Sequence, residues 1–155
     1  GLEVQVTRIL AVHGDRDTMA RAETYAQSCL AAAQEHDRVA YRAHERSFHS
    51  ALAVATRNRL LTKLVDDTYD LTSALRHRDT ATTQDTLDLA EQHLVIVQAA
   101  MAGDEAKAAD QMRDHLLRTQ RMVVEAFEAE ERARQAGESV SETPVGETPV
   151  GADPR

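Results

Sequence analysis

All three prolines of the chain lie at or beyond Pro144, so the long segment before them lacks the residue that most strongly interrupts a helix. Alanine, leucine, glutamate, glutamine and arginine dominate that segment, and these side chains lose little conformational freedom on entering a helix. No stretch alternates between apolar and polar residues at the period of two that a half-buried strand requires. The sequence therefore predicts an all-α fold.

Breaks in the helical pattern divide this segment into six parts. Glycines or polar clusters mark the breaks, and Asp17, Asp37 and Asp104 stand where an N-cap side chain would accept amide protons of the next helix. The connections are short, which favours an antiparallel bundle of about six helices. The predicted helices cover residues 2–13, 18–35, 38–55, 59–78, 83–102 and 105–135.

The composition changes from Gly137 onward, where Ser, Thr, Pro, Gly and Glu predominate. The sequence ETPVG occurs twice in succession there, at residues 142–146 and 147–151. Such a segment cannot bury enough apolar surface to order itself. We therefore predict one helical domain at residues 1–135 and a disordered C-terminal tail at residues 136–155.

Composition and charge narrow the classes of function. A chain of 155 residues, 42% of them hydrophobic, can build one core of ordinary size. The net charge of −8 argues against direct contact with a nucleic-acid backbone, which favours clustered positive charge. No run reaches the roughly 18–20 apolar residues that span a bilayer, and Cys29 has no partner for an intrachain disulfide. We expect a cytoplasmic protein without a membrane partner.

Two polar residues interrupt the apolar face of the predicted helix at 38–55. Tyr41, Phe48 and Leu52 repeat at the spacing of one helical face. At about 100° per residue, Glu45 and His49 fall on the same arc. A carboxylate and an imidazole, one helical turn apart, are therefore predicted to face the core.

Two further histidines interrupt the apolar faces of the last two predicted helices. His93 projects with Leu89 and Val97, away from the polar residues of its helix. His115 lies within the apolar stripe of the final helix, one turn after Met112. The sequence thus predicts three inward histidines and one inward carboxylate.

Burying these four side chains separately would cost about 1–3 kcal/mol for each polar group left without a partner. A divalent cation such as Zn or Ni is one partner, because imidazole nitrogens and carboxylate oxygens bind such ions and the facing helices of a bundle can converge on one point. The alternative is a polar core in which each histidine is satisfied by a hydrogen bond. An E-x-x-x-H spacing does not by itself choose between them.

Two motifs resemble those of a known family. In the first motif, residues 45–49 read ERSFH and are followed by Leu52 and by N-x-L-L at residues 58–61. The second motif starts at His93 with H-x-x-I-x-x-A and continues with G-D, A-A-x-x-M and H-L up to residue 116. They are similar to "D-x-x-F-H-x-x-L … N-x-L-L" and "H-x-x-I-x-x-A-I-x-x-G-D … A-x-x-A-M-x-x-H-L" of the FadR C-terminal (FCD) domain. This domain is the effector-binding part of one branch of GntR-type bacterial transcription regulators. The resemblance covers residues 2–128.

The resemblance implies a set of ligands. In metal-binding members of this family an Asp and three His hold a divalent ion, and a small carboxylate effector completes its coordination. By that match Glu45, His49, His93 and His115 would bind the metal, with Glu45 standing where the family usually has Asp. Arg76 matches a region that offers a basic residue to the effector, although an arginine there is also favoured by the dipole at a helix C-terminus.

The resemblance also implies a regulatory role without catalysis. Family members form homodimers, and an N-terminal winged-helix domain contacts the DNA. The chain begins at Gly1, already within a predicted helix, and contains no winged-helix segment, so we expect a piece of a longer regulator that reaches DNA only through a missing N-terminal domain. Its dimer contacts are expected on helix faces away from the metal site.

Two rival functions remain open at the level of sequence. A bundle with three His, a carboxylate and an open coordination position could be a metal-dependent hydrolase or oxygenase, although no inward-facing residue is an obvious additional general base. A metal-free helical dimerisation domain, whose histidines bond one another, is the second rival. Metal analysis of freshly purified protein distinguishes that rival from the sensor.

Overall fold

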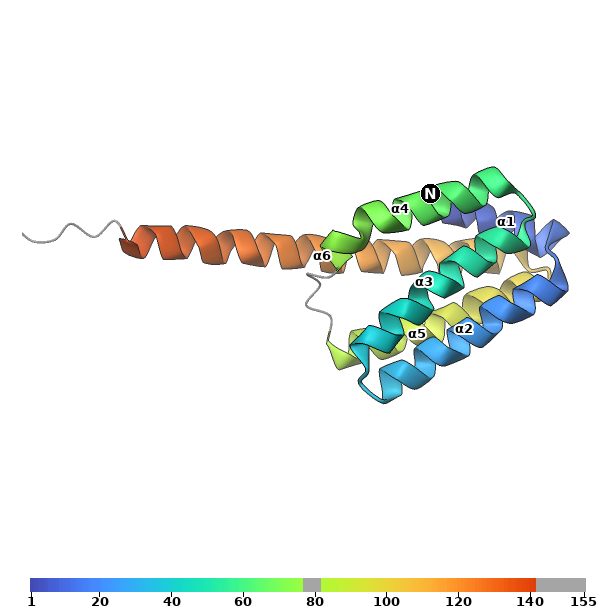
Figure 1. Ribbon diagram of the computed structural model, residues 1–155, viewed down its shortest axis with the longest axis horizontal. Coiled ribbons are helices and arrows are strands. Elements are labelled where there is room, and N and C mark those ends of the chain that lie inside the picture. The colour runs from blue at the N-terminus through green and yellow to red at the C-terminus, as the bar shows by residue number, and fades with distance from the viewer. Residues whose placement is uncertain (77–81, 142–155) are drawn as a thin grey trace, which may run out of the picture.

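The computed structural model describes the backbone of residues 1–76 and 82–141 and the side chains of residues 1–72 and 82–136. All regular structure in these residues is helical, which confirms the predicted fold class (Figure 1). The helices are α1 (Leu2–His13), α2 (Arg16–Gln34), α3 (Arg38–Ala55), α4 (Arg59–Arg76), α5 (Thr83–Met101) and α6 (Glu105–Ser141).

The helix boundaries follow local signals. The side chain of Asp37 accepts a hydrogen bond from the amide of Ala40 at 2.9 Å, and that of Asp104 accepts one from Lys107 at 3.1 Å, so both predicted N-caps are confirmed. The backbone turns into the left-handed region at Gly103, with φ 76°, where glycine carries no steric penalty.

One predicted N-cap is wrong. Asp15, rather than Asp17, precedes α2, and Asp17 lies in its first turn. The carboxylate of Asp15 accepts a hydrogen bond from the hydroxyl of Thr18 at 2.5 Å and lies 3.3 Å from the guanidinium of Arg57. The side chain of Asp15 makes no capping hydrogen bond to the backbone of α2, so its contacts with Thr18 and with Arg57, far along the chain, accompany its place before the helix.

The last helix is longer than predicted. α6 runs to Ser141 and passes Gly137, beyond the predicted end at residue 135. A single glycine costs a helix interior only about 1 kcal/mol relative to alanine, and the Ala-, Glu- and Arg-rich stretch before it favours continued helix. Residues 142–155 of the predicted disordered tail lie outside the described residues.

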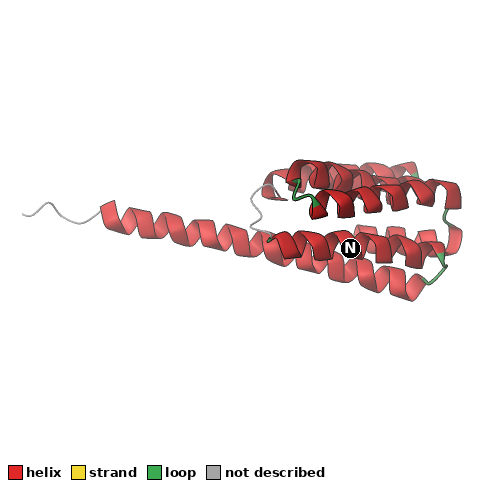
Figure 2. Cartoon of the chain, turned by 90° about the horizontal axis from the view of Figure 1, so that it is seen from below, coloured by secondary structure: helices red, strands yellow, loops and turns green. Residues whose placement is uncertain are grey.

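The helices pack around a shared apolar core. α2 packs against α3 and α5, while α1 packs against α5 and α6 and also contacts α3 and α4. Figure 2 shows the helices stacked in two layers, one of which contains α6, whose C-terminal part continues well past the bundle. Phe48, Leu52, Ile96 and Met112 are at most 1% exposed, so α3, α5 and α6 meet at the centre. The helices that carry the predicted inward residues therefore face one another.

Candidate metal centre

α3 holds Glu45 and His49 on its buried face, where they are 6% and 1% exposed. The same face carries Tyr41, Phe48 and Leu52, all buried, so burial of the two polar residues follows from the apolar residues around them. The predicted orientation of this carboxylate and this imidazole is confirmed.

His93 of α5 and His115 of α6 approach the same point from two other helices. Both are fully buried, and their Nε2 atoms are 3.3 Å apart. The ring of Phe48 lies against that of His93, with 4.4 Å between the ring centroids. The two imidazoles are thus held in an apolar setting with their Nε2 atoms facing each other.

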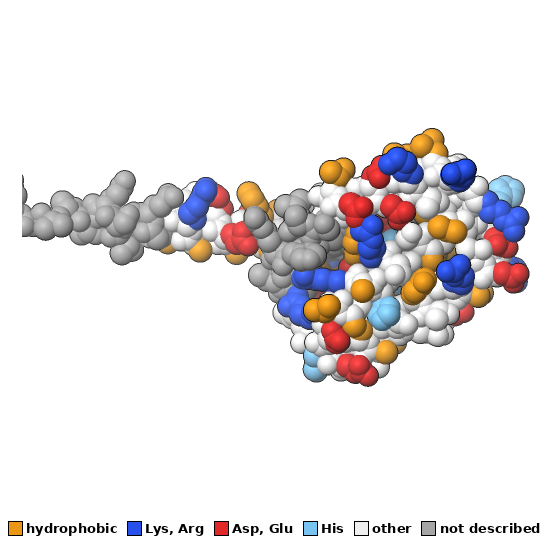
Figure 3. Space-filling view, viewed as in Figure 1, with side chains coloured by type: hydrophobic (Ala, Val, Ile, Leu, Met, Phe, Trp, Pro, Cys, Tyr) orange, Lys and Arg blue, Asp and Glu red, His pale blue; other side chains and the backbone are white. Residues whose placement is uncertain are grey.

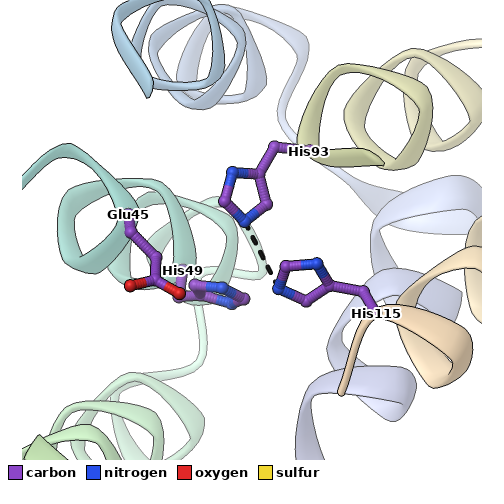
Figure 4. Close-up of side chains that lie close together, drawn as sticks. All are labelled: Glu45, His49, His93 and His115. Carbon is purple, nitrogen blue, oxygen red and sulfur yellow. Dashed lines mark hydrogen bonds between the residues drawn. The ribbon is translucent and has the colours of Figure 1, made fainter. Parts of the chain in front are cut away.

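Glu45, His49, His93 and His115 form one cluster, called here the Glu/His cluster. Each offers one possible ligand atom, and these four atoms all lie within 4.8 Å of one another. Figure 4 shows the carboxylate and His49 arriving together from α3 and the other two rings arriving from the opposite side. The structure therefore brings together every residue that the sequence suggested as a metal ligand.

The spacing and chemistry of the Glu/His cluster fit a divalent ion. Two imidazole nitrogens that bind one ion at about 2.1 Å in tetrahedral geometry are about 3.4 Å apart, close to the observed 3.3 Å between His93 and His115. The Nε2 atom of His49 is buried and has no hydrogen-bond partner among the described residues. A buried nitrogen of this kind is costly unless something binds it.

Glu3 is a member of the site that sequence reasoning missed. Its carboxylate contacts Nδ1 of His49 from α1 and is 15% exposed. A carboxylate on the far nitrogen of a metal-binding histidine fixes the ring orientation and leaves the near nitrogen free to act as a ligand. The signal was present, since Glu3 shares the spacing of one helical face with Thr7 and Leu10, both buried.

Tyr69 of α4 is the second member that was missed. Its hydroxyl donates a hydrogen bond to Oε2 of Glu45 at 3.0 Å, and the residue is 9% exposed. The guanidinium of Arg46 lies 5.4 Å from the centre of the Tyr69 ring and forms an ion pair with Asp70. The carboxylate of Glu45 is thereby oriented by a helix other than its own.

Residues 1–118 match the family model of the FCD domain. The chain belongs to the FCD domain family. FCD domains are the effector-sensing domains of GntR-type transcription regulators, which agrees with the resemblance seen in the motifs. No curated protein sequence matches the chain.

Two ion pairs of the FCD domain join the start of α5 to α6. The guanidinium of Arg118, three residues after His115, lies 2.9 Å from Asp85 and 2.7 Å from Asp88. The hydrogen bond from Arg118 lowers the pKa of Asp85, and hydrogen bonds from Gln84 and Arg118 lower that of Asp88. These ion pairs hold together the two helices that carry His93 and His115.

Arg76, the predicted effector-binding residue, is the last residue of α4. Its side chain lies outside the described residues of the FCD domain.

None of the helices in the described part of the chain combines the length and apolar character needed to cross a bilayer.

Proposed function

We propose that this FCD domain binds a divalent metal ion through Glu45, His49, His93 and His115, and that the ion holds a small carboxylate effector. The observation that carries the proposal is the convergence of four potential ligand atoms within 4.8 Å in the core. Scattered buried histidines would not require such convergence, because each could be satisfied by its own neighbour.

The donor set indicates which ions would fit. Three imidazoles and one carboxylate suit Zn or Ni, whereas Mg and Ca favour sites made of oxygen atoms. Glu carries its carboxylate one methylene further from the backbone than the Asp usual in the family. The hydrogen bond from Tyr69 holds that longer side chain in place, which supports Glu45 as a ligand.

Charge supports an anionic effector at this position. The chain has a net charge of −8, so its overall charge does not attract a di- or tricarboxylate. A bound divalent ion would supply concentrated positive charge and a coordination position for one carboxylate oxygen. Arg76 stays a predicted second contact for the effector.

The residues around the Glu/His cluster provide the means of signalling. Its four side chains come from α3, α5 and α6, while Glu3 and Tyr69 add contacts from α1 and α4. An effector shifts a conformational equilibrium only if it binds one arrangement of these helices more tightly than another. We propose that the arrangement controls an N-terminal winged-helix DNA-binding domain outside this chain.

The distance between His93 and His115 also fits a metal-free alternative. The 3.3 Å between the Nε2 atoms of His93 and His115 is also compatible with a long hydrogen bond between two neutral rings. Such a domain would be a purely structural helical unit. It would contain no metal after purification, and chelation would leave its melting temperature unchanged.

Metal analysis of the freshly purified chain, followed by thermal melts, tests the proposal. Melts are recorded before chelation, after chelation, after addition of Zn or Ni, and with a panel of small carboxylates on both forms. A ligand at 100 times its dissociation constant stabilises the native state by about 2.7 kcal/mol. The proposal requires that chelation lower Tm, that metal restore it, and that a carboxylate raise it only in the metal-loaded form. If none of these conditions moves Tm, the metal-free alternative is correct.

A further inference from the structure

The Oε1 atom of Gln92 in α5 is a buried acceptor without a hydrogen-bond partner among the described residues. An acceptor of this kind costs free energy unless a donor reaches it, so native structures rarely leave one unexplained. Figure 3 shows acidic and basic side chains interspersed over one face of the molecule, where water also reaches them. The Gln92 oxygen is closed to water, so its donor has to come from within the bundle.

Two contacts between α5 and α6 locate the Gln92 side chain. Asp88, one turn before Gln92, lies 2.7 Å from the guanidinium of Arg118. His93, the residue after Gln92, faces His115, which precedes Arg118 by three residues. At about 100° per residue, Gln92 points only about 40° away from Asp88 around the helix axis. Its side chain therefore lies against α6, at the level of His115.

Metal binding would fix the position of the ring proton of His115. A neutral imidazole carries one proton, on either Nδ1 or Nε2. Nε2 of His115 faces Nε2 of His93 at 3.3 Å, so it is the nitrogen that would bind an ion shared by the two rings. Nδ1 of His115 then carries the proton and has to donate it to an acceptor inside the bundle.

The structure shows an acceptor in this position at His49, whose Nδ1 contacts the carboxylate of Glu3. We propose that Oε1 of Gln92 accepts the corresponding hydrogen bond from Nδ1 of His115 when the Glu/His cluster holds its ion. Gln92 is then a positioning residue, because it orients a ligand without touching the ion. An amide suits this place, since it accepts a hydrogen bond without adding another buried charge.

This role rests on the proposed metal site and predicts different effects in the two forms of the domain. Without the ion, the Gln92 oxygen has no partner, so an apolar side chain of similar size should not destabilise the domain. With the ion, the same replacement removes the acceptor for Nδ1 of His115, so it should weaken metal binding. A side chain that only filled space between α5 and α6 would not separate the two forms.

Metal titrations and thermal melts of Gln92→Met test this difference. We expect its affinity for Zn, measured by competition with a chromogenic chelator, to fall about 10- to 100-fold. The Tm of the metal-free variant should equal or exceed that of the metal-free wild-type chain. Gln92→Glu keeps an acceptor and should restore most of the affinity. Gln98→Met, at an exposed glutamine of the same helix, is the matched control and should keep the wild-type affinity.

Nuclear magnetic resonance reports on the hydrogen bond itself. At saturating Zn, the proton on Nδ1 of His115 should resonate further downfield in the wild-type chain than in Gln92→Met, because a proton shared with an acceptor oxygen is less shielded. The same resonance position in both chains would exclude Gln92 as the acceptor.

Three further outcomes would contradict the role of Gln92. Equal Zn affinities of Gln92→Met and the wild-type chain would overturn it while leaving the proposed metal site intact. A lower Tm of metal-free Gln92→Met would overturn it as well, because the amide would then stabilise the bundle without the ion. A wild-type chain that binds no Zn would remove the proposed function and the role of Gln92 together.

Discussion

The carboxylate of Glu3 contacts Nδ1 of His49, 46 positions further along the chain. This contact joins the first helix of the bundle to a potential metal ligand in the third. It leaves Nε2, the buried nitrogen without a partner among the described residues, as the only ring nitrogen of His49 that could bind an ion. The orientation of His49 therefore depends on a residue that is not itself a ligand.

Removing the charge of Glu3 should weaken metal binding without unfolding the domain. We expect Glu3→Gln to lower the affinity for Zn or Ni about 10- to 100-fold, the usual loss when a partner of a ligating histidine is removed. Competition against a chromogenic chelator measures this change. Glu35→Gln, on the exposed end of α2, is the control and should keep the wild-type affinity. Equal affinities for the two variants would mean that Glu3 does not orient His49.

Replacing one proposed ligand should abolish metal-dependent stability. In His93→Asn the cluster loses a nitrogen that lies 3.3 Å from His115, so the purified variant should contain less than one tenth of the wild-type metal and its Tm should not respond to chelation. Elemental analysis and thermal melts provide the two measurements. His36→Gln changes an exposed histidine and should retain full metal content. Full metal content in His93→Asn would contradict the assignment of His93.

The hydroxyl of Tyr69 should contribute to stability through Glu45. Tyr69→Phe removes the donor of a 3.0 Å hydrogen bond to a buried carboxylate, which typically costs about 1–3 kcal/mol in the free energy of unfolding. Urea denaturation of the metal-free proteins measures this difference. Tyr25→Phe, on the half-buried side of α2, should change the same quantity by less than about 0.5 kcal/mol. An unchanged free energy of unfolding in Tyr69→Phe would show that this hydroxyl does not stabilise Glu45.

The ion pairs of Arg118 should make stability sensitive to acid. The pKa values of Asp85 and Asp88 lie below their ordinary value of 3.8 in the folded protein. A hydrogen bond from Arg118 lowers the pKa of Asp85, and hydrogen bonds from Gln84 and then Arg118 lower that of Asp88. A lowered folded-state pKa adds stability above the ordinary value, and this stability is lost as the pH falls through the folded-state pKa.

Arg118→Gln should therefore lower Tm at pH 7 by at most about 4 °C, because the pairs are partly exposed. The Tm difference between Arg118→Gln and the wild-type chain should shrink once the pH falls below 3.8. Melts of both proteins between pH 3 and pH 7 measure it. The control is Arg113→Gln, whose ion pair with Asp110 lies within α6 and does not join two helices. A Tm difference that stays constant down to the lowest pH would rule out the aspartates as its source.

Local sequence was enough to predict the helices and the orientation of the cluster. The 3.6-residue period of a helix decides which side chains share a face, so Glu45 and His49 could be assigned to the core from Tyr41, Phe48 and Leu52 alone. Helix ends were less predictable where two signals competed. Asp15 and Asp17 are equally suitable caps in sequence, and contacts of Asp15 with Thr18 and with Arg57, far along the chain, accompany the choice of Asp15.

Only the tertiary structure decided how the helices meet. A helical period says which face is buried but not which other helix covers it, so the approach of His93 to His115 depends on the packing of α5 against α6. The contacts of Glu3 and Tyr69 with α3 also depend on helix packing. The buried face of α3 does not indicate that α1 and α4 supply the residues that contact it. The sequence by itself determined the helices and their buried faces, which depend on neighbours within a few residues. The convergence of five helices on one point required the packing of the whole chain.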